Sequence, residues 1–361
     1  MSNKYINIIN IIENIIKENI IGDYIEIFRS NIQKEFNTDL VFSIEDYIQI
    51  FDDFSLKYSK NAFFAKEWFD YCINTDLNYI NNFLQDFDIK NRQYVCIFLF
   101  RYLYCIPYIA FLKKENISES YYNNLIFTTE ELKEQKEYHE TQQSKFSRYK
   151  CAGNIDITAG YYQHGLPNLP EKIKKYIKYK DFFDIGAYTG DSMLVLKDFS
   201  PSRIYSFEPD SYLYNTLLQT IKMNSLNKKT IPINIGLSDI DGIKILGMSS
   251  FGMVCDPIMA EKIFKTRSVK LDSFVFNKGC NPGLLKLDVE GSEYSIIVGG
   301  SEKIIKKYKP VLLISVYHRP QDFFEIKEHI VKWKLNYEFK MEQYNCWRPN
   351  IETVLVCYPK L

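Results

Sequence analysis

Residues 181–192 read DFFDIGAYTGDS and contain the turn that decides the fold. An apolar run ends at Asp184, and Gly186 and Gly190 follow in a spacing close to that of a nucleotide-binding turn. Glycines let the backbone approach a ligand, and the N-terminus of a following helix offers free N–H groups. The pattern DxGxxxG lacks the third glycine of the dinucleotide fingerprint, and its acid would repel a pyrophosphate. The turn therefore favours a cationic ligand, such as the methionine part of S-adenosylmethionine (SAM), over a nicotinamide dinucleotide.

Short apolar runs alternate with amphipathic segments from about residue 150 onward, at RIYSFEPD (203–210), TIPINIGLSD (230–239), GLLKLDVEG (283–291) and PVLLISVYH (310–318). Repeated strand–helix–strand units predict parallel pairing with right-handed crossovers, which gives a doubly wound α/β sheet. Two further strands, 334–345 and 352–361, are joined by the turn-like CWRPNI (346–351) and predict an antiparallel C-terminal hairpin. A mostly parallel sheet with a reversed C-terminal strand is the Rossmann-like layout of class I methyltransferases, although many other α/β folds contain hairpins.

The N-terminal part has a different pattern and predicts a helical accessory domain over 1–148, before a SAM-binding domain over 149–361. Apolar residues recur there at intervals of three and four, and glycine is nearly absent. The run YVCIFLFRYLYCIPYIAFL (94–112) approaches the length of a bilayer span. Arg101 at its centre would cost roughly 2.5–3.5 kcal/mol on insertion, so we expect a buried helix and no stable membrane insertion.

The amino-acid composition limits which binding partners and which cellular compartment are expected. The 361 residues include 45 Lys and Arg against 45 Asp and Glu, so the formal net charge is zero. This balance argues against non-specific electrostatic binding of nucleic acid by the protein as a whole. The 8 cysteines show no CxxC pair and no zinc-finger spacing, which favours reduced thiols and a cytoplasmic location. A homodimer is left open by the sequence.

Polar residues follow the ends of the second and third predicted strands. In an open α/β sheet the ligand binds at the carboxyl ends of the strands, beside the point where strand order reverses. Glu208 and Pro209 end the second strand, and a carboxylate there can accept two hydrogen bonds from a ribose diol. Ser238 and Asp239 follow the third strand, where a side chain could meet the adenine edge.

The fourth and fifth strands bring ionisable residues to the same edge. The block LLKLDVEGSEY (284–294) places Asp288 and Glu290 after an apolar strand, whereas Glu293 is explained by the preference of helix N-termini for acids. The fifth strand delivers His318, one of 4 histidines, to the rim. This position makes His318 a candidate general base.

The motifs DIGAYTGDS, FEPD, GLSDIDG and LLKLDVEGSEYSIIVGG, in this order, closely resemble those of FkbM-type SAM-dependent methyltransferases. The resemblance covers roughly residues 178–358, and LKLDVEGSE is its most specific block. It implies a class I fold and methyl transfer from SAM, usually to a hydroxyl of a sugar, glycan or natural product. It does not extend to the N-terminal helical region. Tyr188 and Thr189 depart from it, because the family often carries Asn or Asp and a small or apolar residue there.

The resemblance implies roles for the matching positions of this sequence. The turn would hold the methionine end of SAM, Glu208 would hold the ribose, and Ser238 and Asp239 would lie near the adenine. The predicted cofactor-binding residues are Asp184, Gly186, Ala187, Tyr188, Thr189, Gly190, Asp191, Ser192, Glu208, Pro209, Ser238, Asp239 and Asp288. The predicted catalytic residues are Asp288 and His318, with Glu290 behind them.

The chemistry leaves alternatives open. A hydroxyl acceptor has to lose its proton, whereas an amine acceptor needs only its neutral form, so N-methylation of a glycan substituent or an amino acid is a variant. Asp288 and Glu290 could hold a divalent metal, but without a histidine pair or a clear oxygen-ligand array we predict none. A non-catalytic SAM-binding adaptor, whose helical domain carries the function, is the alternative from another class. The expected partner is a small-molecule or glycan acceptor.

Overall fold

A computed structural model of the protein describes residues 4–18, 20–57, 63–75, 77–113, 124–146, 148–249, 252–254, 262–344 and 352–361. These residues divide into two compact units, one within Met1–His139 and the other formed by Glu140–Tyr344 with Glu352–Leu361. The division falls within helix α9 (Thr129–Phe146), upstream of the boundary predicted after residue 148.

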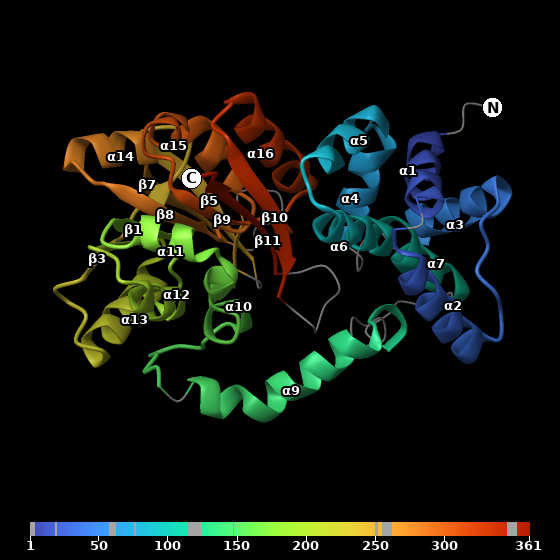
Figure 1. The fold of residues 1–361 in the computed structure, drawn as a ribbon, viewed down its shortest axis with the longest axis horizontal. Coiled ribbons are helices and arrows are strands. Elements are labelled where there is room, and N and C mark those ends of the chain that lie inside the picture. Colours follow the sequence, from blue (N-terminus) through green and yellow to red (C-terminus); the bar gives the residue numbers. More distant parts are fainter. Residues whose placement is uncertain are drawn as a thin grey trace. The chain divides into compact units, whose positions relative to one another are not determined.

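The first unit is helical, as its apolar periodicity predicts. Its helices before α9 are α1 (Ile6–Lys17), α2 (Gly22–Phe36), α3 (Ile44–Lys57), α4 (Phe63–Ile73), α5 (Leu77–Gln85), α6 (Ile89–Phe100) and α7 (Ile106–Lys113), with a π-helical segment at Arg101–Cys105 between the last two (Figure 1). In α1 the residues Ile8, Ile12 and Ile15 are buried, because their spacing places them on one face of the helix.

The apolar segment Ile89–Lys113 is long and apolar enough to cross a membrane, and 83% of its most apolar window is buried inside the protein. Arg101 lies near its middle and is also buried. Its guanidinium donates to both carboxylate oxygens of Glu131, at 2.6 and 2.8 Å, and to the hydroxyl of Tyr24 at 3.1 Å. The charge that disfavours insertion is thus paired within the helical unit.

The second unit is built on a seven-stranded sheet of order β10-β11-β9-β8-β1-β2-β3. The strands are β1 (Asp181–Ile185), β2 (Ile204–Phe207), β3 (Thr230–Ile233), β8 (Pro282–Leu287), β9 (Val311–Ser315), β10 (Tyr337–Gln343) and β11 (Thr353–Pro359). All neighbours pair in parallel except β11, which is antiparallel to both β9 and β10. The predicted doubly wound sheet with a C-terminal hairpin is confirmed, and the turn predicted at 346–351 lies outside the described residues.

Helices cover both faces of this sheet (Figure 1). One face carries α10 (Ile157–Gly160), α11 (Glu171–Ile177), α12 (Asp191–Leu196) and α13 (Ser211–Met223), and the other carries α14 (Leu271–Lys278), α15 (Glu302–Tyr308) and α16 (Pro320–Lys332). Every residue of β1, β8 and β9 is buried. These strands are mostly apolar and do not alternate, as expected for parallel strands covered on both sides, with Asp184 and Lys286 as charged exceptions.

A second, four-stranded sheet of order β4-β7-β5-β6 was not predicted. It consists of β4 (Gly236–Leu237), β5 (Gly242–Ser249), β6 (Gly252–Val254) and β7 (Lys262–Val269). β5 pairs antiparallel with β6 and β7, whereas the two-residue β4 pairs in parallel with the end of β7. This insertion lies between β3 and α14 and leaves the order of the main sheet unchanged.

Candidate active site

The turn after β1 owes its glycines to close packing within the chain. Gly186 has φ +78°, and a Cβ atom there would overlap with the carbonyl oxygen of Asp288. Gly190 has φ +94°, and a Cβ atom would come within 2.9 Å of Leu217 on α13. Both positions require glycine because of the left-handed backbone and the neighbouring atoms. The glycines thus let β1, β8 and α13 approach one another.

Three predicted cofactor residues in this turn bind the preceding segment of the chain. The hydroxyl of Thr189 donates to the carbonyl of Asn154 at 3.1 Å. The buried carboxylate of Asp191 accepts from the amide of Asp156 at 2.9 Å, and the hydroxyl of Ser192 lies 2.9 Å from Nε2 of the buried His164. These side chains anchor residues 154–164 to the sheet. Ala187 is fully buried in the hydrophobic core.

Asp184, at the end of β1, is fully buried beside a lysine that sequence reasoning missed. The Nζ atom of Lys286 lies 3.5 Å from Oδ1 of Asp184 and donates to the carbonyl of Gly186 at 2.8 Å. Burial raises the pKa of Asp184, and the Lys286 cation acts in the opposite direction. Neither carboxylate oxygen has a hydrogen-bond partner among the described residues. A lysine inside the apolar strand LLKLD was the available signal for this pair.

Glu208, at the end of β2, is held in place by the backbone. One carboxylate oxygen accepts from the amide of Tyr188 at 3.0 Å and the other from the amide of Asp210 at 2.9 Å. Burial raises the pKa of Glu208 to about 7, although the two amides act against this rise. Each oxygen keeps a further acceptor site, so the carboxylate can still bind a diol. Pro209 follows it, with its carbonyl 3.2 Å from Nδ2 of Asn234.

Ser238 and Asp239 lie after β4, against the glycine pair near α15. The Ser238 hydroxyl pairs with the hydroxyl of Ser268 and accepts from the amide of Ile240 at 3.2 Å, so this side chain is engaged within the protein. The side chain of Asp239 borders Gly299, and the carbonyl of Ser238 borders Gly300. A contact of Ser238 or Asp239 with adenine stays a prediction.

The structure brings His318 and Glu293 together as a buried pair. Nδ1 of His318 lies 2.9 Å from Oε1 of Glu293, which also accepts from the amide of Val289 at 2.8 Å. The other oxygen of Glu293 accepts from the amide of Gly291 at 2.9 Å. Glu293 begins a helical segment, as the sequence suggested, and its carboxylate also orients the imidazole.

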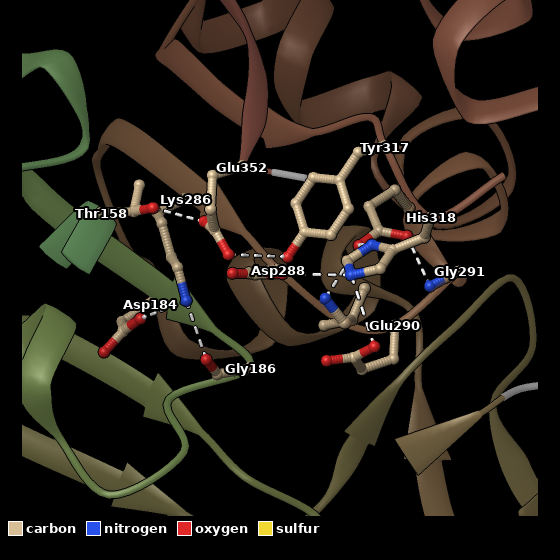
Figure 2. Close-up of polar contacts among 12 residues, drawn as sticks. Thr158, Asp184, Gly186, Lys286, Asp288, Glu290, Gly291, Tyr317, His318 and Glu352 are labelled. Atoms are coloured by element: carbon tan, nitrogen blue, oxygen red, sulfur yellow. Dashed lines mark hydrogen bonds and ion pairs between the residues drawn. The ribbon is translucent and has the colours of Figure 1, made fainter. Parts of the chain in front are cut away.

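Asp288 and Glu290 complete the cluster around this histidine (Figure 2). Nε2 of His318 lies 3.6 Å from Oδ1 of Asp288 and 3.4 Å from Oε2 of Glu290. The side chains of Asp288 and Glu290 are 25% and 39% exposed, so solvent reaches the carboxylates. Glu290 has φ +55°, which is rare for a residue with a side chain. The three predicted catalytic residues therefore meet at the carboxyl ends of β8 and β9.

The charges of this cluster influence one another. Burial alone would lower the pKa of His318, but the carboxylates of Glu293, Glu290 and Asp288 raise it well above its ordinary value. Burial likewise raises the pKa of Glu290, with His318 opposing the rise. The neighbouring carboxylates thus favour the imidazolium form of His318, in which Nε2 cannot accept a proton. Which of Asp288, His318 and Glu290 acts as the general base stays a prediction.

Residues 184–341 match the sequence model of the family described as the methyltransferase FkbM domain. Residues 184–341 form an FkbM methyltransferase domain. The resemblance found in the motifs is confirmed, and the family is one of SAM-dependent methyltransferases.

One solved structure supports a methyltransferase fold for this chain. The chain is 19% identical to the methyltransferase FkbM from Methylobacillus flagellatus KT, with a TM-score of 0.51, and the match covers 81% of this chain and 61% of that one. The chain thus spans less than two thirds of that protein. An rRNA methylase from Streptococcus thermophilus is 11% identical with a TM-score of 0.36, covering 58% of this chain and 99% of that one. No curated protein matches the chain.

A further polar network adjoins the cluster around His318, and two of its members, Glu352 and Thr158, had no signal in the sequence. The buried carboxyl of Glu352 accepts from the hydroxyl of Thr158 and from the hydroxyl of Tyr317 at 3.3 Å (Figure 2). The ring of Tyr317 packs on His318, with centroids 4.1 Å apart. Glu352 directly precedes β11 and Thr158 lies in α10, so only the folded sheet brings them to this edge.

The cluster around His318 contains atoms that could bind a cation. Donor atoms of Asp288, Glu293 and His318 all lie within 4.8 Å of one another. Carboxylate oxygens and imidazole nitrogen are common ligands of divalent ions. The arrangement also suits the positive charge of a sulfonium or an ammonium group.

Proposed function

We propose that this protein transfers a methyl group from SAM to a hydroxyl of a sugar, a glycan or a related small molecule. The observation that carries the proposal is the Glu208 carboxylate, fixed by two backbone amides at the end of β2 within an FkbM domain. It lies directly after the second strand, where a ribose-binding acid is expected in this type of sheet.

The residues present suit SAM. The Tyr188 amide that fixes Glu208 belongs to the glycine turn, so the turn and the ribose acid form one unit. Asp184 supplies buried carboxylate oxygens that lack a hydrogen-bond partner among the described residues. Asp184 and Glu208 are therefore the residues that we assign to the methionine part and the ribose.

When bound, SAM supplies an activated methyl group, which forms a bond to the acceptor oxygen while the carbon–sulfur bond breaks and its electron pair stays on sulfur. The protein has to align the acceptor for this displacement, and positioning can lower the barrier by about 7–11 kcal/mol. The proton of the acceptor hydroxyl passes to a carboxylate oxygen of Asp288 or Glu290, which solvent and substrate can reach. His318 balances the negative charge of these carboxylates.

Charge favours an oxygen acceptor over an amine. Asp288, Glu290 and Glu293 surround the single imidazole of His318. Neighbouring carboxylates raise the pKa of a bound amine, because they stabilise the ammonium form. An ammonium group has no lone pair for the methyl transfer, so the carboxylates that attract an amine also disfavour its reaction.

Calorimetric titration with SAM and with NAD tests the cofactor assignment. We expect wild-type protein to bind SAM, and Glu208→Gln to weaken that binding about 10- to 100-fold, because charge-assisted hydrogen bonds to the ribose are lost. The control is Glu171→Gln, which removes an exposed carboxylate that pairs with Lys174 on α11. Binding of NAD without binding of SAM would refute the proposal.

Methyl-labelled SAM then tests the acceptor class. Pairs of sugars that differ only in a hydroxyl or an amino group at one position are incubated with the protein, and labelled product is counted. We expect label on the hydroxyl member of a pair. Label only on amino members would establish N-methylation, and SAM binding without transfer to any acceptor would favour the adaptor alternative.

A further inference from the structure

One ring nitrogen of His318 has a hydrogen-bond partner among the described residues, and the other has none. Nδ1 is paired with Glu293, whereas Nε2 has no hydrogen-bond partner among the described residues. His318 as a whole is only 6% exposed, so water does not readily satisfy this nitrogen. Buried polar atoms are nearly always paired, and an exception points to a ligand. Figure 2 shows Nε2 directed toward Asp288 and Glu290.

The distances around Nε2 differ from those of hydrogen bonds. Oxygens of Asp288 and Glu290 lie 3.6 and 3.4 Å from it, whereas a charge-assisted N–H···O bond is about 2.7–2.9 Å long. Metal–ligand bonds of about 2.1–2.2 Å, at octahedral to tetrahedral angles, separate neighbouring ligand atoms by roughly 3.0–3.6 Å. Each of the two oxygens therefore lies at the distance from Nε2 that separates neighbouring ligands around one ion.

Glu293 supplies the second feature of a metal-binding histidine. Ligating histidines almost always donate their other ring N–H to a carboxylate or a carbonyl, which fixes the tautomer and orients the ring. Oε1 of Glu293 takes this place at 2.9 Å from Nδ1. Because Glu293 also accepts from two backbone amides, its own position is fixed and it acts from outside the ligand set.

We infer that His318 Nε2, Asp288 and Glu290 bind a divalent metal ion, with Glu293 as the positioning residue. This inference replaces the expectation of no metal site that the sequence suggested. A histidine pair, whose absence led to that expectation, is not needed when one buried imidazole and two carboxylates converge. The left-handed backbone of Glu290, with φ +55°, helps to turn its side chain toward the imidazole.

The charge and exposure of the cluster agree with an ion that exchanges with solvent. Asp288 and Glu290 carry negative charge beside the buried Glu293, and a divalent ion would replace the proton on Nε2 as the balancing charge. The partial exposure of both carboxylates leaves coordination positions open to water or to an acceptor oxygen. One imidazole with two carboxylates suits Mn²⁺ or Zn²⁺ better than Mg²⁺, which prefers all-oxygen sites.

The metal site deepens the proposed function and, in its catalytic role, rests on it. An ion at this position lowers the pKa of a hydroxyl that occupies an open coordination position. The released proton can pass to the second oxygen of Asp288 or Glu290, so each carboxylate serves as ligand and proton acceptor. The binding of the ion itself does not depend on methyl transfer.

Titration of the metal-free protein with MnCl2, followed by calorimetry and by the electron paramagnetic resonance of free Mn²⁺, tests the inference. We expect one Mn²⁺ per chain, competition by Zn²⁺ and weaker binding of Mg²⁺. His318→Gln and Asp288→Asn should each weaken Mn²⁺ binding by at least about 100-fold. Glu293→Gln should weaken it by about 10- to 100-fold, which is the usual range for an outer-sphere partner.

The control is Glu302→Gln, which removes an exposed carboxylate paired with Lys306 on α15 and should leave Mn²⁺ affinity unchanged. Urea unfolding of every variant in parallel reports whether the fold is intact, and SAM titration of the wild type tests the proposed function. Absence of stoichiometric Mn²⁺ and Zn²⁺ binding, or equal Mn²⁺ binding by wild type, His318→Gln and Asp288→Asn, overturns the metal site. SAM binding without metal binding would leave the proposed function standing, and metal binding without SAM binding would remove the proposed function alone.

Discussion

The turn after β1 and the rim formed by β8 and β9 both matched a family motif, yet the fold uses their side chains in opposite ways. In the turn, Thr189, Asp191 and Ser192 bond to residues 154–164 of the same chain. At the rim, Asp288 and His318 keep polar atoms without a hydrogen-bond partner in the described part of the chain.

This difference shows that a polar residue can belong to a family motif for two reasons, because it stabilises the fold or because it binds a ligand. A polar group that is already paired within the protein stabilises the fold, and its contribution to ligand binding is indirect. A buried group that lacks a partner has a cost that only a ligand removes. The turn therefore contributes mainly its backbone, beside the carboxylates of Asp184 and Glu208 at the ends of β1 and β2, whereas the rim contributes side-chain chemistry.

The largest effect is expected at Gly186, where a substitution tests whether the turn is needed for close packing against the residue that follows β8. We expect Gly186→Ala to destabilise the protein by about 4 kcal/mol or more, because the new Cβ overlaps with the carbonyl of Asp288 and φ is +78°. Urea unfolding measures the loss. Gly279→Ala is the matched control, because φ is +65° there but no described atom lies within 4 Å of a Cβ. It should cost only about 1–2 kcal/mol. Equal costs at the two positions would mean that backbone strain, and not the contact with β8, makes Gly186 necessary.

A smaller effect is expected where the turn and the rim meet, at Lys286. We expect Lys286→Met to lower the free energy of unfolding by about 3 kcal/mol, because Asp184 is left as a buried, unpaired acid. Asp184→Asn in the same chain should recover part of this loss. A double-mutant cycle in urea measures the coupling between the two residues. Additive losses would show that Lys286 acts through the carbonyl of Gly186 alone.

The smallest expected effect is a pH dependence of stability from Asp191. Burial raises the pKa of Asp191 to about 7, with the Asp156 carboxylate adding to the rise. Between its ordinary pKa of 3.8 and about 7 the folded protein holds a proton that the unfolded chain releases. Stability therefore falls as the pH rises through this window. We expect Asp191→Asn to reduce the fall between pH 5.5 and 7.5 by about 1–2 kcal/mol in urea unfolding. An unchanged pH slope in this variant would contradict the assignment.

Several features of the site could be read from the sequence because they depend on local order. DFFDIG, FEPD and LKLDVEG each place an acid directly after an apolar strand, and all three strands carry it to the same edge of the sheet. His318 could be predicted in the same way, because it closely follows the apolar strand β9. Lys286 gave a signal that went unused, since a charged residue within an apolar strand is unusual. Glu352 and Thr158 gave none, because 194 positions separate them in the chain.

The sequence by itself determined the alternation of strands and helices, the C-terminal hairpin and the family, because apolar periodicity and strand-end motifs are properties of neighbouring residues. Only the tertiary structure decided which polar groups are satisfied within the chain. Asp191 and Glu293 are both acids in a motif, but the first binds the preceding segment and the second orients His318. That distinction depends on which distant backbone and side-chain groups lie within hydrogen-bond distance, and this is fixed when the sheet is assembled.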